Sequence, residues 1–215
     1  MSITYEVILF PFSWEFSIRM SIKVLGVASS MRKDSFSTAT LRIALEKANQ
    51  NGAETKLLNL YNNPLPFYYD RSRGNISNID LATEMVKSSH AFILATPDYH
   101  GSMAGTLKNF LDHFWSDFAG KTFGYICASH EKGLTVMDHM RTAIRQCYGW
   151  SLPYGISINS SQDFNSNREI TNSRLLMRLN SFSRDLVVYG SLIHEQFKKD
   201  LNSNINTTFA AHYRK

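Results

Sequence analysis

The sequence has few cysteines and lacks the short motifs that would assign a chemistry at once. Its 215 residues include two cysteines, Cys127 and Cys147, which form no CxxC pair. A disulfide scaffold and a dithiol redox motif are therefore unsupported, and we expect reduced thiols in a cytoplasmic protein. The chain also has no HExxH, GxSxG, GxGxxG or GxxxxGK[ST] motif. Nothing in it therefore predicts a metal site, a serine hydrolase, a dinucleotide fingerprint or a P-loop.

Long apolar runs and a strong charge bias are absent as well. The apolar residues 7–12 are few and are flanked by Glu6 and Glu15, which excludes a secretory signal or a membrane span of about 20 residues. The net charge of +5 is mild and its basic residues are dispersed. We therefore expect no nucleic-acid partner and no membrane partner. Residues 1–20 precede the first predicted strand and are expected to be a dispensable extension.

What the sequence does contain is a regular alternation of short apolar runs and amphipathic segments. Helical stripes of apolar residues separate the runs, and the last stripe covers residues 175–189. This alternation predicts an α/β domain over residues 21–200, with a parallel sheet covered by helices on both faces. The Asn- and Thr-rich residues 201–215 are expected to form a flexible tail. Strands are predicted at residues 22–28, 55–60, 91–95, 121–128 and 153–158.

A hydroxyl-rich loop follows the first predicted strand and leads into a helix. Its polar side chains include Ser30, Arg32, Ser35 and Ser37. Free backbone N–H groups and the helix dipole favour an anion at such a helix N-terminus. Because hydroxyls replace the glycines of a pyrophosphate loop, the pattern favours the terminal phosphate of a mononucleotide. The alternative is that the serines only cap the helix.

A second polar loop begins where the third predicted strand ends. Residues 96–112 read TPDYHGSMAGTLKNFLD, so that a proline stops the apolar run and a helix begins after a glycine-containing turn. Open α/β sheets bind ligands at the carboxyl ends of their strands. We therefore expect this loop and the hydroxyl-rich loop to form one site.

Together these loops resemble the NADPH-dependent FMN reductase family, which has the flavodoxin-like fold. The family reads roughly GSxRxxSxN in its first loop and PEYxxSxPGxLKNxID after its third strand. Here Ser30, Arg32 and Ser35 match the first pattern, and Ser37 stands where the family often has asparagine. The second pattern is matched by Pro97, Tyr99, Ser102, Gly105, Leu107, Lys108, Asn109 and Asp112.

The resemblance implies a doubly wound five-stranded parallel sheet with strand order 2-1-3-4-5, and a bound FMN. It implies that Ser30, Arg32, Ser35 and Ser37 bind the FMN phosphate. It further implies that the isoalloxazine ring lies against the second loop and a third loop, which supply Pro97, Asp98, Tyr99, His100 and Ser129. Asp98 replaces the usual glutamate, His100 the usual asparagine and Ala104 the usual proline.

The function implied is that of an FMN-dependent NAD(P)H oxidoreductase. NADPH or NADH would be the co-substrate, and a quinone, azo compound, metal oxyanion or free flavin would accept the electrons. Arg71 and Arg73 are candidates for the NADPH phosphate, and the alternative is that they belong to a solvated basic loop. Family resemblance also implies a homodimer or homotetramer. The alternative is a non-enzymatic flavoprotein that transfers electrons or senses redox state.

Overall fold

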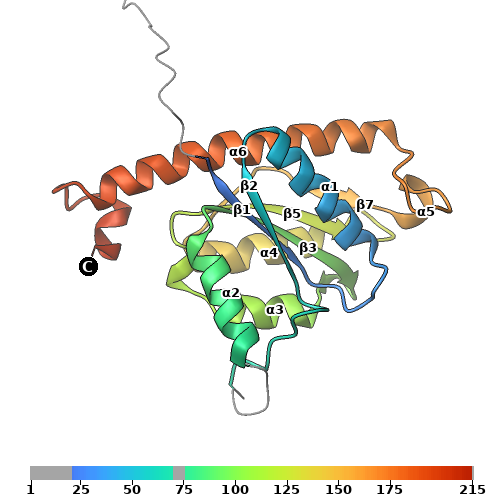
Figure 1. Ribbon diagram of the computed structural model, residues 1–215, viewed down its shortest axis with the longest axis horizontal. Helices are drawn as coiled ribbons and strands as arrows, with labels where there is room; N and C mark the ends of the chain where they lie inside the picture. The colour runs from blue at the N-terminus through green and yellow to red at the C-terminus, as the bar shows by residue number, and fades with distance from the viewer. Residues whose placement is uncertain (1–20, 70–75, 215) are drawn as a thin grey trace, which may run out of the picture.

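A parallel sheet forms the centre of the protein, with helices packed on both of its faces (Figure 1). The computed structural model describes residues 21–69 and 76–214. The predicted extension at residues 1–20, and Arg71 and Arg73, lie outside the described residues. Within the described ranges, no helix is long and apolar enough to cross a membrane.

The sheet follows the order β2-β1-β3-β5-β6, in which each neighbouring pair is parallel. Counted over its parallel strands, this is the predicted order 2-1-3-4-5. The fifth position is shared, because β6 pairs with the start of β5 and β7 with its end. The strands are β1 (Lys23–Ala28), β2 (Glu54–Asn59), β3 (Ala91–Tyr99), β4 (Ser102–Met103), β5 (Thr122–Ala128), β6 (Trp150–Ser151) and β7 (Ile156–Ile158).

The helices divide into two layers. One face of the sheet is covered by α1 and α6, and the other by α2, α3 and α4 (Figure 1). Two short 3-10 helices, η2 (Ser116–Phe118) and η3 (Phe209–Tyr213), complete the described elements. The α-helices are α1 (Phe36–Gln50), α2 (Ile76–Ser88), α3 (Gly105–Asp112), α4 (Leu134–Gln146), α5 (Ser160–Asp163) and α6 (Ser173–Leu201).

Alternate residues of each central strand enter opposite cores. In β3, Ile93 points into the core under α1 and α6, whereas Phe92 and Leu94 point into the core under α2, α3 and α4. All three side chains are fully buried. The central strands therefore read as continuous apolar runs, which is typical of a parallel sheet covered on both faces.

Two elements extend further than the sequence pattern predicted. Strand β3 continues past Ala95 to Tyr99, because Thr96 and Pro97 still pair with β5. Helix α6 has 29 residues and continues past Tyr189 to Leu201. Beyond it, η3 contacts the end of α6 through Phe209 and Tyr213, whose rings lie 6.1 Å from the Phe197 ring.

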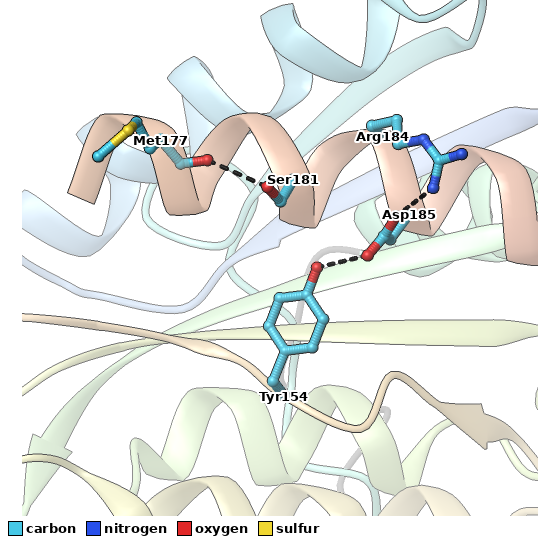
Figure 2. A network of polar contacts seen from close by, with 5 residues as sticks. All are labelled: Tyr154, Met177, Ser181, Arg184 and Asp185. Carbon is cyan, nitrogen blue, oxygen red and sulfur yellow. Dashed lines mark hydrogen bonds and ion pairs between the residues drawn. The ribbon is translucent and has the colours of Figure 1, made fainter. Parts of the chain in front are cut away.

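A polar network fastens the connection between β6 and β7 to α6 (Figure 2). The Tyr154 hydroxyl donates to Asp185 Oδ2 at 2.7 Å, and Arg184 donates to Asp185 Oδ1 at 2.6 Å. Burial and the hydrogen bond to Asp185 raise the pKa of Tyr154 to about 12. Next to it, Arg178 donates to the carbonyl of Gly155 at 3.1 Å. These contacts place the segment that leads into β7 at a fixed position against the last helix.

Candidate functional site

A cleft of about 1760 Å³ opens at the carboxyl edge of the sheet. It is lined by the loop after β1, the end of β3, the loop after β5 and the segment that follows β7. The cleft is larger than a typical small-molecule pocket of about 300–1,000 Å³. It therefore has room for a cofactor and a second molecule beside it.

The loop after β1 ends at the N-terminus of α1, where Ser35 is the capping residue. Its Oγ accepts a hydrogen bond from the N–H of Thr38 at 3.4 Å. Among the described residues, no hydrogen bond uses the N–H groups of Phe36 and Ser37. The first turn of α1 also contains no acidic residue. This helix end therefore offers two backbone donors and a positive dipole to an anion.

The other predicted phosphate-binding residues occupy different depths. Arg32 is exposed and lines the cleft, whereas Ser30 is buried and also lines it. The Ser30 Oγ accepts a hydrogen bond from the N–H of Arg32 at 3.3 Å, which shapes the loop. Ser37 is fully buried, does not line the cleft, and exchanges a 2.9 Å hydrogen bond with the Ser35 hydroxyl. Ser37 could therefore affect a ligand through Ser35 but does not face the cleft.

The polar, glycine-containing loop predicted at the end of β3 is a tight hairpin, in which β3 pairs with the two residues of β4. Tyr99 pairs with Ser102, and the two residues between them both have positive φ angles: 57° at His100 and 77° at Gly101. Two such residues in succession are characteristic of a type I′ turn, which favours Asn-Gly. The hairpin holds Pro97, Asp98, Tyr99 and His100 along one wall of the cleft.

Asp98 connects this hairpin to the loop after β5. Its Oδ1 accepts the N–H of Gly101 and its Oδ2 accepts the Ser129 hydroxyl, both at 2.8 Å. The Ser129 Oγ in turn accepts the N–H of Glu131 at 3.1 Å. Both carboxylate oxygens of Asp98 are thus engaged in holding two loops together. The arrangement suits a structural anchor better than a group that exchanges protons.

A buried thiol lies beneath this wall. Cys127, in β5, is fully buried, and burial raises the pKa of its thiol to about 12, with the Asp98 carboxylate acting in the same direction. Both cysteines of the chain are free. Cys127 therefore stays protonated and is not a nucleophile for the cleft.

The fourth wall of the cleft contains residues that no sequence motif indicated. Asp163 accepts hydrogen bonds from the N–H of Asn159 at 2.7 Å and from Asn172 Nδ2 at 2.6 Å. Asn172 is also the N-cap of α6. The segment between β7 and α6 is therefore fixed at both ends, and it brings Gln162 and Arg168 to the cleft, beside Arg174 from the first turn of α6.

Of the residues predicted to bind FMN, the structure brings all except Ser37 together in one cleft. The wall made by residues 157–174 was not anticipated, because it belongs to a polar segment with no periodic pattern. Within residues 21–69 and 76–214, no group of three or more His, Cys, Asp or Glu side chains is arranged to hold a metal ion.

Comparisons with known proteins agree with this geometry. The profile of the NADPH-dependent FMN reductase family matches residues 22–163. An FMN-dependent NADPH-azoreductase of Staphylococcus aureus is 28% identical over 183 residues, which cover 78% of this chain and 95% of the relative.

Two solved structures share the fold. An apo NADH:FMN oxidoreductase superposes with a TM-score of 0.65 at 18% identity, covering 80% of this chain and 89% of its own. The NAD(P)H:(acceptor) oxidoreductase FerB of Paracoccus denitrificans superposes with a TM-score of 0.63 at 18% identity, covering 81% and 98%.

Proposed function

The chain belongs to the NADPH-dependent FMN reductase family and is an FMN-dependent oxidoreductase that uses NADPH, and from this premise we propose that the cleft holds FMN in two halves and reduces a small acceptor. The observation that carries the proposal is that the phosphate loop and the β3–β4 hairpin line the same cleft. FMN, when bound, supplies the chemistry that accepts hydride from NADPH and passes the electrons on. The side chains therefore need to bind and orient rather than to react.

We assign the phosphate half of the site to Ser30, Arg32 and Ser35, with Ser37 behind them. The residues present fit a terminal phosphate, because the start of α1 offers hydroxyls, two free N–H groups and no carboxylate in its first turn. A phosphate monoester has about 1.5 to 2 negative charges near neutral pH, which such a helix end stabilises.

We assign the ring half to Pro97, Asp98, Tyr99 and His100, together with Ser129. The hairpin presents backbone groups to the cleft, while Asp98 and Ser129 hold the hairpin against the loop after β5. This anchoring fixes the backbone donors and acceptors that would orient a planar ring. Tyr99 is 41% exposed and is available to cover one side of the cleft.

The acceptor we propose is a small, flat or compact oxidant: a quinone, an azo compound, a metal oxyanion or free flavin. The azoreductase and the FerB acceptor oxidoreductase, to which the chain is similar, support this class. The open cleft also supports it, since its volume leaves space for NADPH and the acceptor in turn.

We further propose that the protein is a cytoplasmic homodimer or homotetramer. Phe67, Tyr69 and Trp115 are large aromatic residues with exposed fractions of 79%, 95% and 67%. Exposed aromatic side chains of this kind are enriched where subunits meet. The two free cysteines support a reducing compartment.

A spectroscopic titration tests the proposed function. The purified protein is mixed with FMN, and the flavin absorbance is followed while NADPH is added without oxygen. We expect stoichiometric FMN binding and bleaching of the flavin band. Failure to bind FMN would contradict the assignment of the cleft, whereas bound FMN that NADPH does not bleach would favour the non-enzymatic alternative. Arg32→Ala should weaken FMN binding about tenfold through loss of a charged hydrogen bond.

A further inference from the structure

Arg168 reaches the phosphate loop from a segment that the family profile does not cover. The profile ends at residue 163, and Arg168 lies in the wall between β7 and α6. Its Nη2 donates to the carbonyl of Asp34, and its Nη1 lies 3.6 Å from Asp34 Oδ1. Its guanidinium carbon also lies 4.5 Å from the centre of the Phe36 ring. Arg168 therefore contacts both residues that flank Ser35.

The backbone of Arg168 has an unfavourable conformation. A small hairpin joins Phe164 and Ile170, and inside it the N–H of Arg168 donates to the carbonyl of Asn165 at 2.9 Å. The φ angle of Arg168 is 66°, in the left-handed region where glycine and asparagine are preferred. An arginine at this position costs free energy, so its side chain should repay that cost through the contacts it makes.

The position of the guanidinium is electrostatically unusual. It lies beside the N-terminus of α1, where the helix dipole is positive and repels a cation. Asp34 compensates for this only in part, since its side chain is 75% exposed and its ion pair is loose. A second anion at this helix end would therefore be attracted by the dipole and by the guanidinium together.

Asp34 gives the guanidinium a further role. A carboxylate next to the phosphate loop repels a bound phosphate unless a cation neutralises it. Arg168 is the side chain that forms an ion pair with Asp34 among the described residues. It also stacks on Phe36, which restricts where its charge can move.

We propose that Arg168 is a positioning residue that makes the cleft selective for phosphorylated flavin, by neutralising Asp34 and fixing the loop that precedes α1. This inference rests on the proposed function, since it concerns the phosphate half of the same site. It assigns a role in cofactor binding to the part of this wall that follows residue 163 and so lies outside the region matched by the family profile.

The test compares FMN with riboflavin, which has the same ring and no phosphate. Dissociation constants for both ligands are measured by flavin fluorescence with the wild-type protein and its Arg168→Gly variant. Glycine suits the left-handed backbone, so this variant removes the guanidinium without straining the hairpin. We expect FMN to bind about tenfold more weakly, because the Asp34 carboxylate is then uncompensated beside the phosphate, and riboflavin to change less than about twofold. Thermal unfolding of the variant without ligand should match or exceed that of the wild type.

A second substitution separates charge from shape. In the Arg168→Gly background, Asp34→Asn removes the uncompensated carboxylate and should recover most of the lost FMN affinity. Arg168→Lys keeps the charge and should retain more FMN affinity than Arg168→Gly does. Unchanged FMN affinity in Arg168→Gly would overturn the inference, and so would an equal loss for FMN and riboflavin, which would mean that the hairpin only shapes the cleft.

The outcome for the wild type keeps the two proposals distinct. A wild-type protein that binds FMN and is reduced by NADPH, paired with an Arg168→Gly variant of equal affinity, would overturn only the role of Arg168. A wild-type protein that binds no FMN would contradict the proposed function itself, and the role of Arg168 with it.

Discussion

Mild acid should destabilise this protein through two stacked histidines at the end of the sheet remote from the cleft. His90 directly precedes β3 and stacks on His194 of α6, with ring centres 3.8 Å apart and planes at 13°. Burial lowers the pKa of His90 to about 4, and the charges of His194, Lys121 and their basic neighbours act in the same direction. The Nδ1 of His90 also accepts the N–H of Lys23 at 3.2 Å, which requires that nitrogen to be unprotonated.

The size of the effect follows from proton linkage. In the unfolded chain the pKa of His90 returns to 6.5, so below that pH the unfolded state binds the proton that the folded state excludes. The contribution of neutral His90 to the free energy of unfolding therefore has its full value above pH 6.5. It decreases as the pH falls from 6.5 towards 4. At pH 5 the protein would lose about 2 kcal/mol of stability if the whole pKa shift of His90 acted. Solvent screening at this half-buried site reduces the expected loss to about 1 kcal/mol.

Urea unfolding of the wild type at pH 7.5, 6 and 5 measures this slope, and His90→Gln provides the comparison. Glutamine can accept the Lys23 N–H but does not titrate, so the variant should lose less stability on acidification. Lys198→Gln removes a nearby positive charge that lowers both histidine pKa values and should make the slope shallower. A wild-type protein with equal stability at pH 7.5 and pH 5, or a His90→Gln variant with an unchanged slope, would refute the reasoning.

Three further substitutions test the local structure by urea unfolding. His100→Asn should stabilise the protein by about 0.5 kcal/mol, because asparagine suits the left-handed turn better; a loss of stability would argue against that turn. Gly124→Ala should cost about 1–3 kcal/mol by overpacking, since its Cβ would lie 2.5 Å from Phe182 Cζ. Gly105→Ala is the steric reference, because its Cβ would have no such neighbour within 4 Å and its φ is not positive. Tyr154→Phe should cost about 1 kcal/mol by removing the donor to Asp185, and an unchanged stability would show that water replaces the tyrosine.

The sheet order and the two-sided burial could be predicted because local patterns determine them. Apolar runs such as the start of β3 are buried on both faces, and this requires helices above and below the sheet. The position of the cleft at the carboxyl edge of the sheet could be predicted because a strand end is a general binding position in such sheets. Family membership was also indicated correctly by the two loop motifs.

The remaining features depend on contacts that a local pattern does not encode. Strand β4 has two residues, too few for an alternating pattern, so the His100-Gly101 turn was the one signal of the hairpin. The fifth strand is divided because the segment around Tyr154 leaves the sheet to bond with α6. Arg168 meets Asp34 across 134 positions of sequence, and no spacing rule connects them.

The burial of Cys127 has a consequence for the durability of the protein. Oxidants attack the thiolate form of cysteine, and its reactivity follows both exposure and pKa. Cys127 lies directly below the cleft wall, yet it is inaccessible to solvent and remains protonated near neutral pH. Peroxide or a quinone that enters the cleft would therefore leave this thiol unmodified, without forming a sulfenic acid or a covalent adduct. Resistance to chemical damage is therefore built into the same strand that supports the site.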